Sequence, residues 1–218
     1  MGLNKGIEEK LNEGRQYRSF DLHAFEHRAE DDGRRIVRGY ATTFNNEYTL
    51  FSTGEYTVVE KVDPHAFDDC DLSDVIMQYD HEGRVFARTS NSTLAVAADE
   101  VGLAIEAELS GTEIGRQLYE EIEGGYTTKM SMGFRVAEDK REVIEDRDNG
   151  TVTVIRTITK ISKLSDVSAV SLPANDATSI SARSFGEGVI AETVKEIDAR
   201  KARDRQKQKV RILLSLED

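Results

Sequence analysis

Three side chains of the types that support nucleophilic catalysis stand far apart in the sequence: His81, Ser131 and Asp166. A serine hydroxyl is a weak nucleophile at neutral pH, so it needs a base within hydrogen-bonding reach. An imidazole can take the proton and deliver it to the leaving group, while a carboxylate fixes the imidazole tautomer and stabilises its cation. The three residue types therefore suit acyl transfer, and spacing alone leaves open whether they meet in space.

Ser131 lies in a segment, residues 129–136, that is expected to form a β-strand. Apolar side chains at positions 130, 132, 134 and 136 alternate with small or polar ones, so one face is apolar and Ser131 points to the other. Its neighbour on that face is Gly133, and a glycine there is expected to leave space for a peptide carbonyl.

The other two candidates also fall on expected strands. His81 closes a strand predicted over residues 72–79, and Asp166 alternates with apolar neighbours in a strand predicted over residues 164–172. A structural role remains an alternative for each, as a strand-end histidine in a salt-bridged turn and as an edge carboxylate. Ser168 and Ser171, close to Asp166, are rival nucleophiles.

Composition limits the classes of function. The 218 residues include one cysteine and carry a net charge of −12, which argues against a general nucleic-acid binder and excludes an internal disulfide. No apolar run reaches membrane-spanning length, so a soluble, intracellular protein without membrane contact is expected. His23 and His27 could share a helical face, but no third ligand is evident, and we expect neither a metal nor a cofactor.

The remaining pattern predicts a mainly β fold with a few helices, arranged as a β-barrel or a compact α+β domain. A helix is expected after a capping box formed by Ser110 and Glu113, and a short helix after Asp63-Pro64. The Asn149-Gly150 pair predicts a tight hairpin turn. We expect a flexible arm over residues 1–33, one domain over 34–182, and a charged helical tail over 183–218.

Several motifs in this order resemble those of the prohead maturation proteases of tailed phages with the HK97-type capsid. The resemblance spans about residues 34–182 and rests on the following segments: Tyr79-Asp-His81, Asp99-Glu-Val-Gly-Leu103, Gly124-Gly125, Met130-Ser-Met-Gly-Phe134, Leu164-Ser-Asp-Val-Ser168 and Pro173-Ala-Asn175. The family is distantly similar to the herpesvirus capsid-maturation proteases, which implies a herpesvirus-protease-like β-barrel.

The resemblance also implies roles. His81 would be the general base, Ser131 the nucleophile, and Asp166, which stands where most members have Glu, would orient His81. The implied function is a serine endopeptidase of the procapsid interior, in the host cytoplasm, that cleaves scaffold segments, the N-terminal segment of the major capsid protein, and itself. Because the herpesvirus relatives dimerise, self-association is a further expectation.

Two other classes of function remain open at this point. The same barrel could serve as a non-catalytic scaffold or capsid-assembly protein, a role that the basic stripe near the C-terminus would suit. A barrel-type binding module unrelated to phage is the third reading. Labelling by a fluorophosphonate distinguishes the serine endopeptidase from the other two classes, because only an activated serine reacts.

Overall fold

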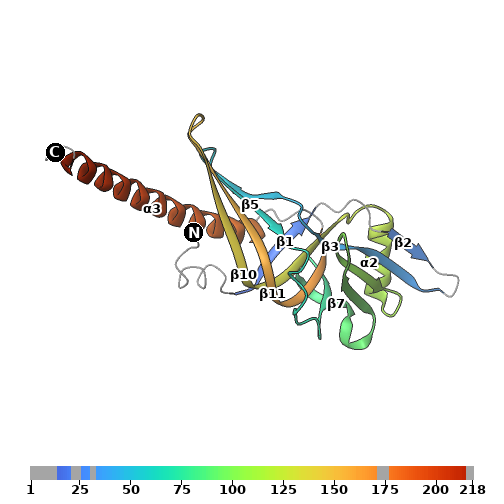
Figure 1. The fold of residues 1–218 in the computed structure, drawn as a ribbon. Coiled ribbons are helices and arrows are strands. Elements are labelled where there is room, and N and C mark those ends of the chain that lie inside the picture. The colour runs from blue at the N-terminus through green and yellow to red at the C-terminus, as the bar shows by residue number, and fades with distance from the viewer. Residues whose placement is uncertain (1–13, 21–25, 30–32, 171–176, 215–218) are drawn as a thin grey trace.

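Strands dominate the fold, as predicted. The computed structural model describes residues 14–20, 26–29, 33–170 and 177–214, and its strands form two sheets (Figure 1). The larger sheet contains β1 (Gln16–Phe20), β4 (Tyr48–Ser52), β5 (Tyr56–Val62), β6 (Ile76–Tyr79), β7 (Glu82–Arg88), β10 (Lys129–Asp146) and β11 (Thr151–Val170). The smaller contains β2 (Glu26–Ala29), β3 (Arg35–Thr43), β8 (Leu94–Ala98) and β9 (Gly102–Glu108). The described strands do not close into the barrel that was expected.

The hairpin of β10 and β11 is the centre of the larger sheet. It turns at residues 147–150, which is the predicted place, but the connection is four residues long and only Gly150, with a φ of 69°, has positive φ, so it is not the tight Asn-Gly turn that was expected. The larger sheet has the order β1-β10-β11-β5-β4, and β6 pairs with both β11 and β7. The strand that contains Asp166 was predicted over residues 164–172, but β11 already begins at Thr151. The strand runs on through the polar residues Ser162 and Lys163, because Lys163 keeps its pairing with Arg135.

The core lies under the apolar face of the hairpin. Met130, Met132, Phe134 and Val167 are fully buried there and belong to the main hydrophobic cluster. Helix α2 (Glu113–Glu123) contributes Leu118, Tyr119 and Ile122 to the same core.

The cap of α2 differs from the prediction. The N-cap is Thr112, whose hydroxyl accepts a 3.0 Å hydrogen bond from the amide of Gly115. Ser110 donates instead to Glu108, so Ser110 and Glu113 do not form the expected capping box. The helix predicted after Asp63-Pro64 is a run of turns.

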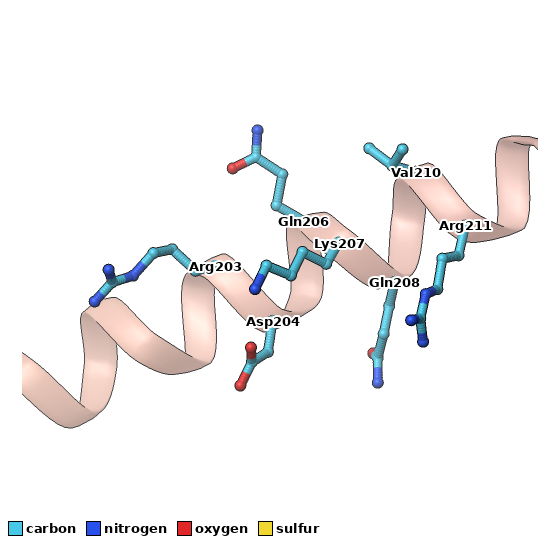
Figure 2. A pocket seen from close by; sticks show the side chains of 7 residues that line it. All are labelled: Arg203, Asp204, Gln206, Lys207, Gln208, Val210 and Arg211. Carbon is cyan, nitrogen blue, oxygen red and sulfur yellow. The ribbon is translucent and has the colours of Figure 1, made fainter.

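Helix α3 (Ala177–Leu214) starts before the predicted tail and projects away from the sheets (Figure 1). Phe185 and Val189 pack against Val58 and Val154. From residue 198 to residue 212 every side chain is exposed. Figure 2 shows side chains of this stretch pointing outward from different sides of the helix, namely those of Arg203, Asp204, Gln206, Lys207, Gln208, Val210 and Arg211. None of the described helices is long and apolar enough to span a membrane.

The N-terminal segment contradicts the expectation of a flexible arm over residues 1–33 where it is described. Residues 16–20 form β1, which pairs antiparallel with β10. Residues 26–29 form β2, which pairs antiparallel with β3. Strand β7, which no pattern predicted, follows β6 in a tight hairpin, and β6 itself covers only the second half of the strand expected over 72–79.

Candidate active site

The β10–β11 hairpin brings Ser131 and Asp166 onto one face of the sheet. In the antiparallel register Ser131 pairs with Ser168, and Gly133 pairs with Asp166. Residues opposite one another on paired strands share a face, as do residues two apart on one strand. The serine and the carboxylate are therefore diagonal neighbours on the face opposite the core.

His81 reaches the same place from the other side of β11. Strand β6 pairs parallel with β11 and then turns into β7 through the two residues Asp80 and His81. Both have positive φ, 48° and 61°, as tight two-residue hairpins require. For residues other than glycine this conformation costs about 1 kcal/mol each. The amide of Asp80 donates to the carbonyl of Ala169 at 3.0 Å, which holds the turn against β11.

The three predicted residues meet in one line of hydrogen bonds. His81 Nε2 lies 2.5 Å from Ser131 Oγ, and His81 Nδ1 lies 2.5 Å from Asp166 Oδ1. Ser131 and Asp166 are fully buried, and the side chain of His81 is 11% exposed. A carboxylate accepts from the Nδ1–H of a neutral imidazole, which leaves the Nε2 lone pair facing the serine hydroxyl.

The charge state of His81 suits a base. Its burial and the positive charge of Arg15 lower the pKa of His81 to about 4, against an opposing effect of Asp80. At neutral pH the imidazole is therefore uncharged, which is the form that accepts a proton.

Asp166 has further partners beside the histidine. Ser168 donates a 2.9 Å hydrogen bond to Asp166 Oδ1, and the guanidinium of Arg15 forms an ion pair with Oδ2. Ser168, one of the rival nucleophiles, is thus bonded to the carboxylate, whereas Ser131 is bonded to His81. The other rival, Ser171, lies outside the described residues.

The space beside Gly133 is occupied, contrary to the expectation that it would receive a peptide carbonyl. A Cβ at position 133 would lie 2.2 Å from Asp166 Oδ2, 2.7 Å from Arg15 Nε and 3.0 Å from the ring of Tyr17. Glycine is needed here because the catalytic carboxylate candidate and β1 pack directly against its Cα.

Residues of the N-terminal segment complete the site, and sequence reasoning missed them. Arg15 contacts Asp166, the ring of Tyr17 lies edge-on to that of His81 with centroids 4.4 Å apart, and the carbonyl of Arg18 accepts from Ser131 at 3.0 Å. The segment from Arg18 to His23 has a weak strand pattern, which was the one signal available.

No arrangement for a metal ion is present in the part of the chain that the structure describes: no group of three or more His, Cys, Asp or Glu side chains is suitably placed. The two side chains weighed as metal ligands, His23 and His27, lie outside the described side chains.

Comparison with known families decides what kind of site this is. The model of the caudovirus prohead serine protease family matches residues 23–196, most of the chain. This chain belongs to the caudovirus prohead serine protease family. The match contains His81, Ser131 and Asp166 and begins after β1. Membership gives the chain a protease role in phage capsid maturation.

Among solved structures, the chain is similar to the bacteriophage T4 capsid assembly protease, gp21. The two share 9% sequence identity with a TM-score of 0.36, over 73% of this chain and 99% of that chain. No curated protein matches the chain at a significant level.

Proposed function

We propose that this prohead protease is a serine endopeptidase in which Ser131 is the nucleophile, His81 the general base and Asp166 the residue that orients His81. The observation that carries the proposal is the pair of 2.5 Å contacts from the two ring nitrogens of His81, one to Ser131 and one to Asp166. A serine, an imidazole and a carboxylate joined in this order are the parts that acyl transfer needs.

The reaction follows from these contacts. As Ser131 Oγ attacks the carbonyl carbon of a peptide bond, its proton passes to His81 Nε2. When the C–N bond breaks, His81 gives that proton to the departing amine, which leaves an ester on Ser131. Water then attacks the ester, again with His81 as base, and releases the acid and the free serine. Asp166 stays ionised throughout and stabilises the imidazolium by accepting from Nδ1–H.

We further propose that the substrates are scaffold segments, the N-terminal segment of the major capsid protein, and the protease itself, all within the procapsid that assembles in the host cytoplasm. Family membership supports action on capsid proteins. The alternative, a non-catalytic assembly protein with the same fold, predicts that the capsid precursor is never trimmed by this chain.

The test is co-expression of the protease with its capsid protein. We expect Ser131→Ala to leave the capsid precursor at full length, because no other hydroxyl is bonded to His81 Nε2 among the contacts described. Ser168→Ala is the matched control, since it removes the rival hydroxyl of the paired position and should only slow trimming. Trimming by Ser131→Ala, or loss of trimming by Ser168→Ala alone, would refute the assignment of Ser131.

A further inference from the structure

The hydroxyl proton of Ser131 has two competing acceptors. A serine hydroxyl carries one proton, and Ser131 Oγ lies 2.5 Å from His81 Nε2 and 3.0 Å from the carbonyl oxygen of Arg18. When the proton points to Arg18, His81 does not activate the oxygen. In that orientation the Arg18 carbonyl holds the nucleophile in an unproductive state.

The strand that carries this carbonyl also covers the other two members of the site. The Tyr17 ring lies against the ring of His81, and Arg15 pairs with Asp166. Three residues within the four-residue stretch 15–18 thus each contact one member of the proposed catalytic unit.

Strand β1 lies where an extended peptide would bind. It is the last strand of the larger sheet and pairs antiparallel with β10, with Ser19 opposite Ser131 and Arg18 opposite Met132. Extended peptides commonly bind proteins by adding a strand to a free sheet edge. With β1 in place, Ser131 is fully buried and the edge of β10 is occupied.

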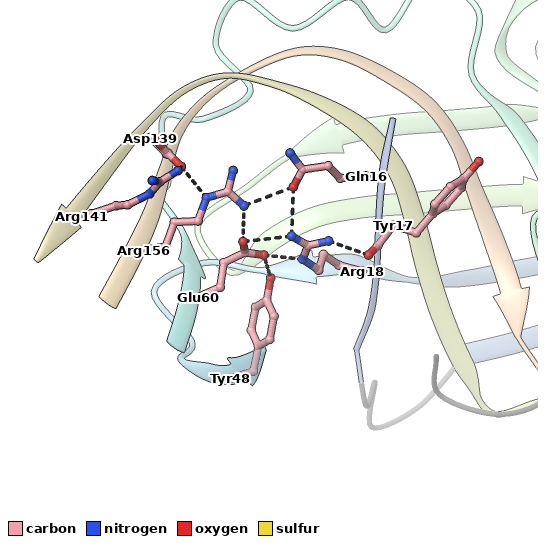
Figure 3. A network of polar contacts seen from close by, with 8 residues as sticks. All are labelled: Gln16, Tyr17, Arg18, Tyr48, Glu60, Asp139, Arg141 and Arg156. Carbon is pink, nitrogen blue, oxygen red and sulfur yellow. Dashed lines mark hydrogen bonds and ion pairs between the residues drawn. The ribbon is translucent and has the colours of Figure 1, made fainter. Parts of the chain in front are cut away.

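The side chains of β1 anchor it on the opposite face. Arg18 donates to Glu60 at 2.6 and 3.1 Å and to Gln16 at 2.9 Å, within a buried network that also includes Arg156. Figure 3 shows Arg18 and Gln16 turned toward Glu60, whereas Tyr17 points away from this network. One face of β1 is thus held by the ion pair between Arg18 and Glu60, while the other face covers the proposed catalytic residues.

The part of the chain matched by the family starts at residue 23, after β1. The strand that covers Ser131 therefore lies outside the matched region, whereas the three residues it covers lie inside it.

We propose that the edge of β10 is the binding surface for the peptide substrate, and that β1 is the chain's own occupant of that surface, which must leave before a substrate can bind. The inference rests on the proposed function. The occupant also defines the chemistry of the partner: an extended peptide with a basic side chain at the position of Arg18, where Glu60 supplies the opposite charge, and an aromatic one at the position of Tyr17.

The first test uses the full-length chain and a small fluorophosphonate that labels activated serines. Arg18→Ala removes the anchor but leaves Glu60 paired with Arg156, so we expect Ser131 to be labelled at least tenfold faster than in the unchanged protein. Arg38→Ala is the control, because it breaks an exposed ion pair with Glu106 in the smaller sheet. A purely structural role for Arg18 would slow labelling or leave it unchanged, and that result would overturn the inference.

The second test adds the occupant back as a free peptide. The hexapeptide Arg-Gln-Tyr-Arg-Ser-Phe, the sequence of residues 15–20, should return the labelling rate of Arg18→Ala toward that of the unchanged protein. A scrambled peptide of the same composition should have no effect. Equal effects of the two peptides would show that the edge of β10 does not recognise this segment.

A third measurement needs no substitution. A phosphonyl group on Ser131 takes the place of the Arg18 carbonyl, so the amides of β1 should exchange with deuterium faster in labelled than in unlabelled full-length protein. Unchanged protection of β1 after complete labelling would overturn the inference while leaving the proposed function intact. If neither the unchanged protein nor Arg18→Ala is labelled, Ser131 is not activated, and the proposed function fails together with this inference.

Discussion

Gly133 and Asp166 are paired across β10 and β11 so closely that the carboxylate takes the space of a side chain at position 133. A Cβ there would lie 2.2 Å from Asp166 Oδ2. Atoms do not approach this closely without a bond, so any side chain at position 133 has to displace the carboxylate. Gly133 therefore fixes the position of Asp166 and, through it, the orientation of His81.

Gly133→Ala should accordingly reduce the rate at which a fluorophosphonate labels Ser131 by about 10²-fold, since displacements of about 1 Å in a catalytic unit have effects of this size. Gly111→Ala is a matched control, because a Cβ at Gly111 would meet nothing within 4 Å. Circular dichroism should show both variants folded. Unchanged labelling of a folded Gly133→Ala variant would contradict the role given to this glycine.

Asp166 should be needed as an anion and not only as a hydrogen-bond acceptor. Asp166→Asn keeps the shape of the side chain but can donate to His81 Nδ1, which stabilises the wrong imidazole tautomer, and we expect a loss of labelling rate of about 10⁴-fold. Asp166→Glu retains the charge and should keep more of the rate than Asp166→Asn. The measurement is the second-order rate constant for labelling; equal rates for the two variants would contradict the prediction.

Arg15 should set the protonation of His81. Its guanidinium is one of the groups that lower the pKa of His81 to about 4, after burial. Arg15→Gln should therefore raise this pKa, so that His81 gains its proton at a higher pH and the labelling rate begins to fall at a higher pH on acidification. A titration of the His81 ring by NMR, with Arg38→Gln as the control, measures the shift directly. No upward shift in Arg15→Gln would show that burial alone is responsible.

Local patterns in the sequence predicted the parts of the site that depend on local structure. The alternation around Ser131 identified its strand and face, and Asn149-Gly150 identified where the hairpin turns. Both signals are local, because side-chain alternation and turn preference depend on residues that are adjacent in the sequence. The proposed trio of His81, Ser131 and Asp166 came from residue types and a family resemblance, and the structure brings the three within hydrogen-bonding distance.

The rest of the site could not be predicted, since it depends on pairing between distant segments. β1 is short and rich in polar residues, and it is a strand because it pairs with β10 and because Arg18 finds Glu60, which is 42 residues away. The turn at Asp80 and His81 has positive φ at two residues other than glycine, a conformation that local propensity disfavours. It is stabilised by the hydrogen bond from the amide of Asp80 to the carbonyl of Ala169, which is distant in the sequence. The burial of Ser131 also depends on the pairing of β1 with β10, so local sequence patterns could not predict it.

The network around Glu60 should make stability depend on pH. Burial alone would raise the pKa of Glu60, but Arg18 and Arg156 outweigh it and lower this pKa to about 2. A carboxyl whose pKa is lower in the folded than in the unfolded state contributes stability above its unfolded pKa. This contribution should be complete above about pH 5 and should decline as the pH falls toward 2. Urea unfolding at a series of pH values measures it.

Glu60→Gln isolates that contribution from those of other carboxyl groups. At pH 7 the substitution leaves Arg18 buried without its counter-charge and leaves Arg156 with Asp139 as its remaining carboxylate, so we expect a loss of roughly 3–5 kcal/mol in the free energy of unfolding. The difference from the unchanged protein should shrink as the pH falls toward 2 and below, because the carboxyl of Glu60 is then neutral in the unfolded state and increasingly neutral in the folded state.

Glu106→Gln is the comparison, since its ion pair with Arg38 is exposed and should contribute less than about 1 kcal/mol at any pH. A pH-independent difference for Glu60→Gln would mean that packing, and not charge, holds β1 and β5 together. In that case the charge of Arg18 would no longer explain how β1 is anchored over Ser131. A difference that vanishes in acid would instead show that the ionised carboxylate of Glu60 holds β1 over the nucleophile.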